Sequence, residues 1–112
     1  MINSFYDRNK RELSETDFSK RVMDNLLVEN GPKSLTFYSH VYLVPGEEVH
    51  YHQHIGDSES YYILSGQGVF NDNGTLVPVK KGDLLFTADG EGHNLTNTGD
   101  EILEFIALTI KE

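Results

Sequence analysis

The sequence predicts an all-β domain, a sandwich or barrel of jelly-roll type built from eight or nine short strands. Runs rich in β-branched and aromatic residues alternate with turn residues at short, regular intervals. The strongest turn signal, Asn71-Asp72-Asn73-Gly74, separates two such runs as in a β-hairpin, because Asn-Gly tolerates positive φ. The length of 112 residues and a hydrophobic fraction of 38 % suit one globular domain with its own core.

Eight strands are expected from residue 35 onward. Glycine, proline, asparagine and aspartate separate most of them, for example at Pro45-Gly46 and at Thr98-Gly99-Asp100. A closed arrangement is favoured because it hides backbone edges that would otherwise pair with other chains. The expected strands are residues 35–44, 49–54, 60–64, 67–70, 76–79, 84–87, 94–97 and 102–110.

The N-terminal part is less clearly patterned. Residues 1–19 are polar with scattered aromatics and are expected to form an arm or irregular lead-in, which leaves residues 20–112 as a single domain. Residues 16–28 fit a helix capped by Thr16, or a strand that ends at Val28 before the turn signal Asn30-Gly31-Pro32. We favour the strand.

Composition excludes several classes of function. The chain has 9 basic and 18 acidic side chains, a net charge of −9, so it lacks the basic surface that nucleic acids or anionic membranes require. The absence of cysteine excludes disulfides, thiolate metal sites and iron–sulfur clusters. No apolar run resembles a signal peptide or a membrane span, which leads us to expect a cytoplasmic protein.

Histidines and one glutamate form a candidate metal site. His52 and His54 lie two apart in an expected strand and therefore project to one face, and His50 shares their parity. Glu59 returns after a turn, and His93 follows a glycine-rich bend. Three imidazoles and one carboxylate suit a divalent Mn, Fe, Co, Ni, Cu or Zn ion. Taken alone, the pair of histidines is as readily a surface pair or a buried structural pair.

The spacing around these residues resembles the two motifs of the cupin superfamily. The first motif reads Gly46, five residues, His52-Gln53-His54, four residues, Glu59, six residues, Gly66. The second reads Gly82, five residues, Ala88-Asp89-Gly90, two residues, His93, three residues, Asn97. Every fixed position matches except a proline, replaced here by Ala88, which we expect to loosen the loop without removing a ligand.

The resemblance implies a double-stranded β-helix, the cupin jelly-roll barrel, holding one divalent transition metal. It identifies His52, His54, Glu59 and His93 as the ligands. It gives the motif glycines structural roles at turns where a Cβ would clash, and Asn97 the role of pinning a loop. The short segment between the motifs resembles small single-domain bacterial members, which are often homodimers built through the outer sheet and N-terminal arm.

Two further residues are candidates for catalysis. Tyr61 shares the parity of Glu59 and could bind substrate or donate a proton, although a structural role in the core is the commoner fate of such a tyrosine. His50 could act as a base, an alternate ligand or a partner of a ligand, or simply lie at the pocket rim. The sequence leaves open which face of residues 35–44 lines the pocket: Tyr38, His40 and Tyr42, or Leu35, Phe37, Val41 and Leu43.

The sequence leaves two functions open. The first is a metal-dependent enzyme acting on a small polar metabolite by dioxygenase, isomerase or decarboxylase chemistry. The second is a metal-assisted binding or sensor module for a small molecule without turnover. The complete ligand set favours the enzyme, whereas the lack of an obvious acid–base pair beyond His50 and Tyr61 favours the module.

Overall fold

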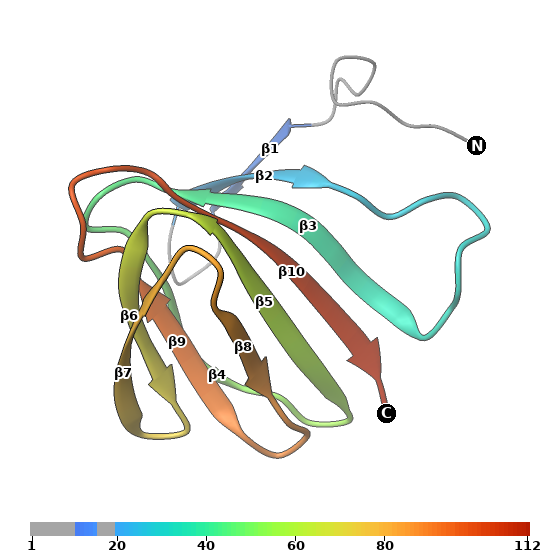
Figure 1. The fold of residues 1–112 in the computed structure, drawn as a ribbon. Helices are drawn as coiled ribbons and strands as arrows, with labels where there is room; N and C mark the ends of the chain where they lie inside the picture. Colours follow the sequence, from blue (N-terminus) through green and yellow to red (C-terminus); the bar gives the residue numbers. More distant parts are fainter. Residues whose placement is uncertain (1–10, 16–19) are drawn as a thin grey trace.

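The computed structural model describes residues 11–15 and 20–112, and this part of the chain folds as ten β-strands without a helix (Figure 1). No helix with the length and hydropathy of a membrane span occurs in the described ranges. The strands are β1 Arg11–Glu15, β2 Lys20–Asn25, β3 Leu35–Leu43, β4 Glu48–Gln53, β5 Asp57–Ser65, β6 Gln67–Asp72, β7 Thr75–Lys80, β8 Leu84–Thr87, β9 Gly92–Thr96 and β10 Leu103–Lys111.

The strands form two antiparallel sheets. One has six strands in the order β1-β2-β3-β10-β5-β8, and the other has four in the order β4-β9-β6-β7. The chain passes repeatedly between the sheets, for example from β4 to β5 and from β8 to β9, so the two sheets face each other as in a jelly roll (Figure 1). The predicted all-β, double-stranded β-helix fold is confirmed, and all eight strands expected after residue 35 are present.

The N-terminal region contains two strands. Lys20–Asn25 is a strand paired with β3, which confirms the preference for a strand over a helix there, although the strand ends at Asn25 and not at Val28 as expected. Arg11–Glu15, inside the stretch expected to be an irregular arm, pairs along its length with β2. Thr16, the candidate helix cap, lies outside the described residues, and the division into an arm and a barrel stays a prediction.

The core lies between the sheets and follows the alternation of the strands. Along β10 the buried residues are Leu103, Phe105, Ala107 and Thr109. Along β3, Val41 and Leu43 are buried at 2 % and 0 % exposure, whereas Tyr42 and its even-numbered neighbours are only partly covered. The sequence left open which face of residues 35–44 lines the pocket. The odd-numbered face of β3 points inward, because that face supplies the apolar side chains.

Two motif glycines illustrate why glycine is needed at the turns. Gly66 has a φ of 86°, and a Cβ there would lie 2.7 Å from the carbonyl oxygen of Ile102. Gly82 has a φ of 91°, but a Cβ there would meet nothing within 4 Å. The expected clash is thus confirmed at Gly66 and wrong at Gly82, and it is equally wrong at Gly46 and Gly90, where an added Cβ would also meet nothing within 4 Å. At these three turns only the left-handed backbone conformation requires glycine.

The loop-pinning role expected of Asn97 is also present. Its side chain is 1 % exposed, and its amide nitrogen donates to the carbonyl oxygens of Leu43 at 2.9 Å and Glu101 at 2.8 Å. Its amide oxygen accepts from the backbone nitrogen of Gly99 at 2.9 Å. Asn97 therefore ties the end of β3 to the loop that leads into β10.

Candidate metal centre

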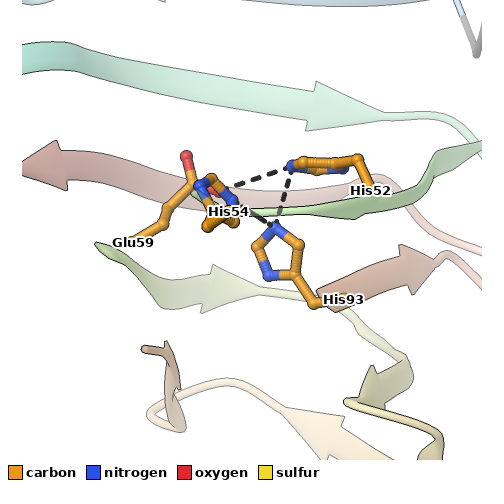
Figure 2. Close-up of side chains that lie close together, drawn as sticks. All are labelled: His52, His54, Glu59 and His93. Atoms are coloured by element: carbon orange, nitrogen blue, oxygen red, sulfur yellow. Dashed lines mark hydrogen bonds and ion pairs between the residues drawn. The ribbon is translucent and has the colours of Figure 1, made fainter. Parts of the chain in front are cut away.

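Four side chains converge inside the barrel at the end where β4, β5 and β9 meet (Figure 2). His52 comes from β4, His54 from the turn that follows it, Glu59 from β5 and His93 from β9. The pairing of β4 with β9 places His52 directly opposite His93. Residues far apart in the sequence are brought together by sheet pairing, and their nearest donor atoms all lie within 4.8 Å of one another.

The donor atoms approach closely. The Nε2 atom of His93 lies 3.0 Å from that of His52, 3.1 Å from that of His54 and 3.0 Å from Oε1 of Glu59. The Nε2 atom of His54 lies 3.1 Å from the same Glu59 oxygen. Imidazole lone pairs and a carboxylate oxygen at such distances repel one another unless a proton or a cation lies among them.

The separations at His93 fit a single transition-metal ion. Metal bonds to imidazole nitrogen are about 2.0–2.1 Å long, so two donors about 90° apart around one ion lie roughly 3.0 Å from each other. The distances at His93 match this value. The nitrogen-rich donor set suits a divalent ion from Mn to Zn better than Mg or Ca, which prefer oxygen. The cluster is therefore suited to metal binding through His52, His54, Glu59 and His93.

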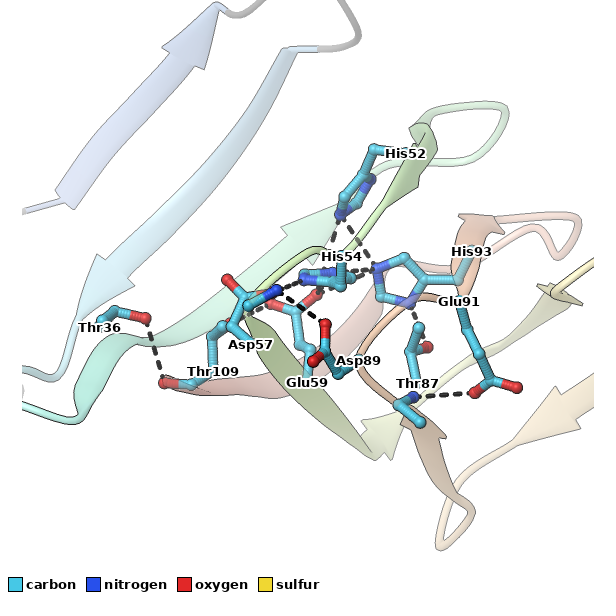
Figure 3. Close-up of polar contacts among 12 residues, drawn as sticks. Thr36, His52, His54, Asp57, Glu59, Thr87, Asp89, Glu91, His93 and Thr109 are labelled. Carbon is cyan, nitrogen blue, oxygen red and sulfur yellow. Dashed lines mark hydrogen bonds and ion pairs between the residues drawn. The ribbon is translucent and has the colours of Figure 1, made fainter. Parts of the chain in front are cut away.

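The atom of each ligand that faces away from the centre also has a partner, and Figure 3 shows the partners of His54, Glu59 and His93. The Nδ1 atom of His52 lies 2.9 Å from the carbonyl oxygen of His50, and that of His54 lies 2.7 Å from Oδ1 of Asp57. With protons on Nδ1 donated to these acceptors, the lone pairs of Nε2 point at the centre. The corresponding partners are Thr87 for His93, at 2.7 Å, and Thr109 for Glu59, at 2.6 Å.

Electrostatics around the cluster favour an ionised carboxylate. Burial opposes ionisation of Glu59, yet hydrogen bonds from His54, His93 and Thr109 outweigh it and hold its pKa well below the usual value. Burial lowers the pKa of His52, which keeps this imidazole neutral and ready to act as a ligand. The hydrogen bond to Glu59 raises the pKa of His54, so a proton competes with a metal ion there.

A cavity of about 260 Å³ adjoins the cluster. Three of the four donor residues line it, together with Thr36, Asp57 and Thr109. Its remaining wall is largely apolar and comes from Phe37, Val41, Val49, Tyr61, Phe105 and Ala107. Among the described residues that line this cavity there is no lysine or arginine. A small molecule can therefore reach the cluster, and the protein itself supplies no fixed cation to hold it.

His50 does not share the face of His52. The pairing of β4 with β9 is irregular between Val49 and His52, so the strict alternation assumed from the sequence fails there. The Nε2 atom of His50 lies 3.1 Å from Oε1 of Glu48, whose other oxygen accepts from Asn94 and Thr96. Along β9, Asn94 and Thr96 alternate with the inward-facing His93 and Leu95, so their side chains point outward. Because Glu48 contacts both of them, its partner His50 lies on the outer surface as well. The expectation that His50 faces the pocket is wrong.

Tyr61 lies where its parity predicted. It is 4 % exposed, lines the cavity, and its ring centre lies 5.0 Å from that of His93 and 4.6 Å from that of Phe105. Tyr61 thus packs within the core and borders the cluster at the same time. The catalytic assignments of Tyr61 and His50 stay predictions.

Hydrogen bonds hold the loop before His93, in which Ala88 replaces the motif proline. The backbone nitrogen of Ala88 donates to the Glu91 carboxylate at 2.9 Å, and the backbone nitrogen of Glu91 donates to the Ala88 carbonyl oxygen at 3.0 Å. Proline could not make the first bond, because it has no N–H. Two backbone hydrogen bonds join His54 to this loop: its nitrogen donates to the Glu91 carbonyl oxygen, and its carbonyl oxygen accepts from the Gly90 nitrogen.

Sequence reasoning missed three residues that contact the ligands: Asp57, Thr87 and Thr109. A signal was present for the threonines. Each threonine occupies the next inward position after an apolar one on its strand: Thr87 follows Leu85, and Thr109 follows Ala107. A hydroxyl at a core position needs a buried partner, which the alternation alone could have indicated.

Comparison with known proteins agrees with the fold and the cluster. A family model described as a cupin domain matches residues 39–109, well over half of the chain. The chain belongs to the cupin family. The matched region contains all four donor residues of the cluster, so this cupin carries the complete histidine and glutamate set.

Relatives of this cupin bear different names. An oxalate-binding protein of Thermotoga maritima is 51 % identical over 73 residues, 65 % of this chain and 60 % of that protein. The (S)-ureidoglycine aminohydrolase of Escherichia coli is 38 % identical over 66 residues, 56 % of this chain and 25 % of that enzyme. The aligned regions thus span 60 % and 25 % of these curated relatives.

Solved structures extend the similarity to the whole chain. A crystal structure of a protein from Thermotoga maritima, described as a predicted oxalate decarboxylase, superposes with a TM-score of 0.91 at 36 % identity. The alignment covers 100 % of both chains. The cupin barrel found here is therefore shared over its full length with that protein.

Proposed function

We propose that this cupin binds a small carboxylate anion of the oxalate type at a divalent transition metal held by His52, His54, Glu59 and His93. The observation that carries the proposal is the cavity, which combines the donor cluster with an apolar wall and lacks any described lysine or arginine. A bound divalent ion supplies the positive charge that attracts and orients the carboxylate oxygens of a ligand.

Charge makes this binding dependent on the metal. Glu59 is ionised, and both Glu59 and Asp57 line the cavity, so a dianion that enters the metal-free cavity meets negative charge. A divalent ion offsets that charge at short range. The oxalate-binding protein of Thermotoga maritima, 51 % identical over the aligned region, supports oxalate as the first ligand to test.

A second candidate function is turnover of the bound anion by a decarboxylase-type reaction. The relative described as a predicted oxalate decarboxylase, which covers this chain completely, favours it over the dioxygenase and isomerase alternatives. Decarboxylation of the oxalate monoanion gives carbon dioxide and formate and needs no co-reactant. Tyr61, which lines the cavity, is the candidate group for moving a proton.

Calorimetry distinguishes these functions from a purely structural barrel. The protein is stripped with a chelator, reloaded with Mn²⁺, Co²⁺ or Zn²⁺, and titrated with oxalate. We expect saturable binding to at least one loaded form and none to the stripped protein. His54→Ala should abolish it, whereas His40→Gln, which changes a histidine outside the cavity that is bonded to Glu104, should not. Absence of binding to every loaded form would overturn the proposal.

Turnover is tested on the same samples by measuring formate and carbon dioxide. Formate released by the loaded protein and lost in His54→Ala would establish the enzyme. Saturable binding of oxalate without formate would establish the binding module.

The predicted homodimer is proposed on the outer face of the six-stranded sheet. Tyr62, Leu84 and Phe86 are 48 %, 67 % and 55 % exposed there, and Tyr62 pairs directly with Leu84 across β5 and β8. Apolar side chains that gather on one exposed face favour association. Light scattering of the purified protein tests this proposal. We expect the wild type to have the mass of a dimer and the double variant Leu84→Glu, Phe86→Glu to have the mass of a monomer.

A further inference from the structure

Two threonines flank the metal-binding glutamate on the neighbouring strands. Glu59 on β5 lies opposite Thr87 on β8 and opposite Thr109 on β10, so the three residues form one row across the six-stranded sheet. All three point inward and are buried, at 6 %, 1 % and 4 % exposure respectively. We refer to Thr87, Glu59 and Thr109 as the threonine row.

The adjacent inward row is apolar. There Tyr61 on β5 lies opposite Leu85 on β8 and opposite Ala107 on β10. On β8 and β10, the inward side chain is thus apolar beside Tyr61 and carries a hydroxyl group beside the metal ligand Glu59. A buried hydroxyl is costly unless it is hydrogen-bonded, so the change needs a reason beyond packing.

Each hydroxyl contacts a different ligand (Figure 3). Thr109 donates to Oε2 of Glu59 at 2.6 Å, which leaves Oε1 for the cluster centre, where it lies 3.1 Å from His54 and 3.0 Å from His93. Thr87 lies 2.7 Å from Nδ1 of His93. A threonine hydroxyl can both donate and accept a hydrogen bond. Thr87 can therefore accept a hydrogen bond from the Nδ1–H group of His93 when Nε2 of His93 must present its lone pair to an ion.

We infer that Thr87 and Thr109 are positioning residues of the metal centre. Thr87 fixes the tautomer and ring orientation of His93, and Thr109 fixes which oxygen of Glu59 faces the ion. Neither residue belongs to the donor cluster itself. The inference rests on the metal binding of the proposed function and adds two residues to the machinery that holds the ion.

Isosteric substitution tests the inference. Thr87→Val and Thr109→Val remove the hydroxyl and keep the branched shape, whereas the serine variants keep the hydroxyl. Thr96→Val is a matched control, because Thr96 also donates to a carboxylate, that of Glu48 at 3.2 Å, but outside the cavity. We expect each valine variant at 87 and 109 to bind Co²⁺ or Mn²⁺ about 10–100-fold more weakly. The serine variants and Thr96→Val should bind like the wild type.

Two further measurements separate positioning from a general loss of structure. The visible spectrum of Co²⁺ at saturation should change in Thr87→Val and Thr109→Val, because the donors take new orientations. Thermal unfolding of the metal-free forms reports folding independently of the ion. If a valine variant does not fold, the comparison of serine with alanine at the same position replaces it, and the hydroxyl alone should restore affinity.

The outcomes distinguish this inference from the proposed function. Wild-type affinity and an unchanged Co²⁺ spectrum in both folded valine variants would overturn the positioning role and leave the proposed function intact. A wild-type protein that binds no divalent metal would overturn both.

Discussion

The Nδ1 atom of His54 lies 2.7 Å from the Oδ1 atom of Asp57. His54 is thereby held between two carboxylates, since its Nε2 atom lies 3.1 Å from Glu59. The other two cluster histidines have neutral groups at Nδ1, a backbone carbonyl for His52 and a threonine hydroxyl for His93. A carboxylate partner makes an imidazole a stronger donor to a metal, so His54 should be the strongest donor of the three imidazoles.

Asp57→Asn should weaken metal binding about 10–100-fold. The amide keeps the shape of the side chain but removes the negative charge that polarises His54. Isothermal titration of the stripped protein with Co²⁺ or Zn²⁺ measures the affinity. Asp100→Asn, a change of the same kind in an exposed loop, is the control and should have wild-type affinity. Equal affinity in both variants would contradict the role given to Asp57.

Metal affinity should rise with pH through the neutral region. The hydrogen bond to Glu59 raises the pKa of His54 above 6.5, so below that raised pKa a proton must leave before a metal ion binds. Titrations at several pH values and in buffers of different ionisation enthalpy count the protons released. In Glu59→Gln the main cause of the raised pKa is gone, and fewer protons should be released near neutral pH.

Acid should destabilise the metal-free protein partly through Glu59. Its pKa is lowered from 4.5 in the folded state, so its ionised form stabilises the fold above pH 4.5, and this contribution is lost as the pH falls further. Urea unfolding of the stripped protein between pH 3 and 7 measures the free energy of unfolding. Glu59→Gln should flatten the acid side of the curve, and an equally steep loss in the variant would refute the assignment.

His50→Ala should leave metal affinity and oxalate binding unchanged. The side chain pairs with Glu48 on the outer surface, and exposed pairs of this kind contribute about 0–1 kcal/mol to stability. Its carbonyl oxygen, which accepts from His52, is part of the backbone and remains in the variant. Calorimetry and thermal unfolding check both points. Loss of turnover with intact ligand binding would restore the catalytic role predicted from the sequence.

Gly66→Ala should destabilise the protein more than Gly82→Ala. Both positions have positive φ, which costs a residue with a Cβ about 1–2 kcal/mol. At Gly66 the added Cβ would also lie 2.7 Å from the Ile102 carbonyl oxygen and 2.9 Å from the Leu103 Cα, and these backbone atoms would have to move. Urea unfolding of both variants gives the two free-energy differences, and equal values would contradict the steric argument.

The sequence by itself determined the strands from residue 35 onward, because turn residues and two-residue alternation are local signals. It also indicated the candidate donor set, since the spacing of His52, His54, Glu59 and His93 resembles the cupin motifs before any pairing is known.

Only the tertiary structure decided which side chains surround that set. Simple alternation placed His50 with the ligands, but an irregularity in the pairing of β4 with β9 turns it outward. The inward face of β3 and the threonine row depend on which strands become neighbours, as when β10 inserts between β3 and β5. Neighbouring strands that are distant in the chain leave no local signal, because the energy that pairs them comes from burying one common core.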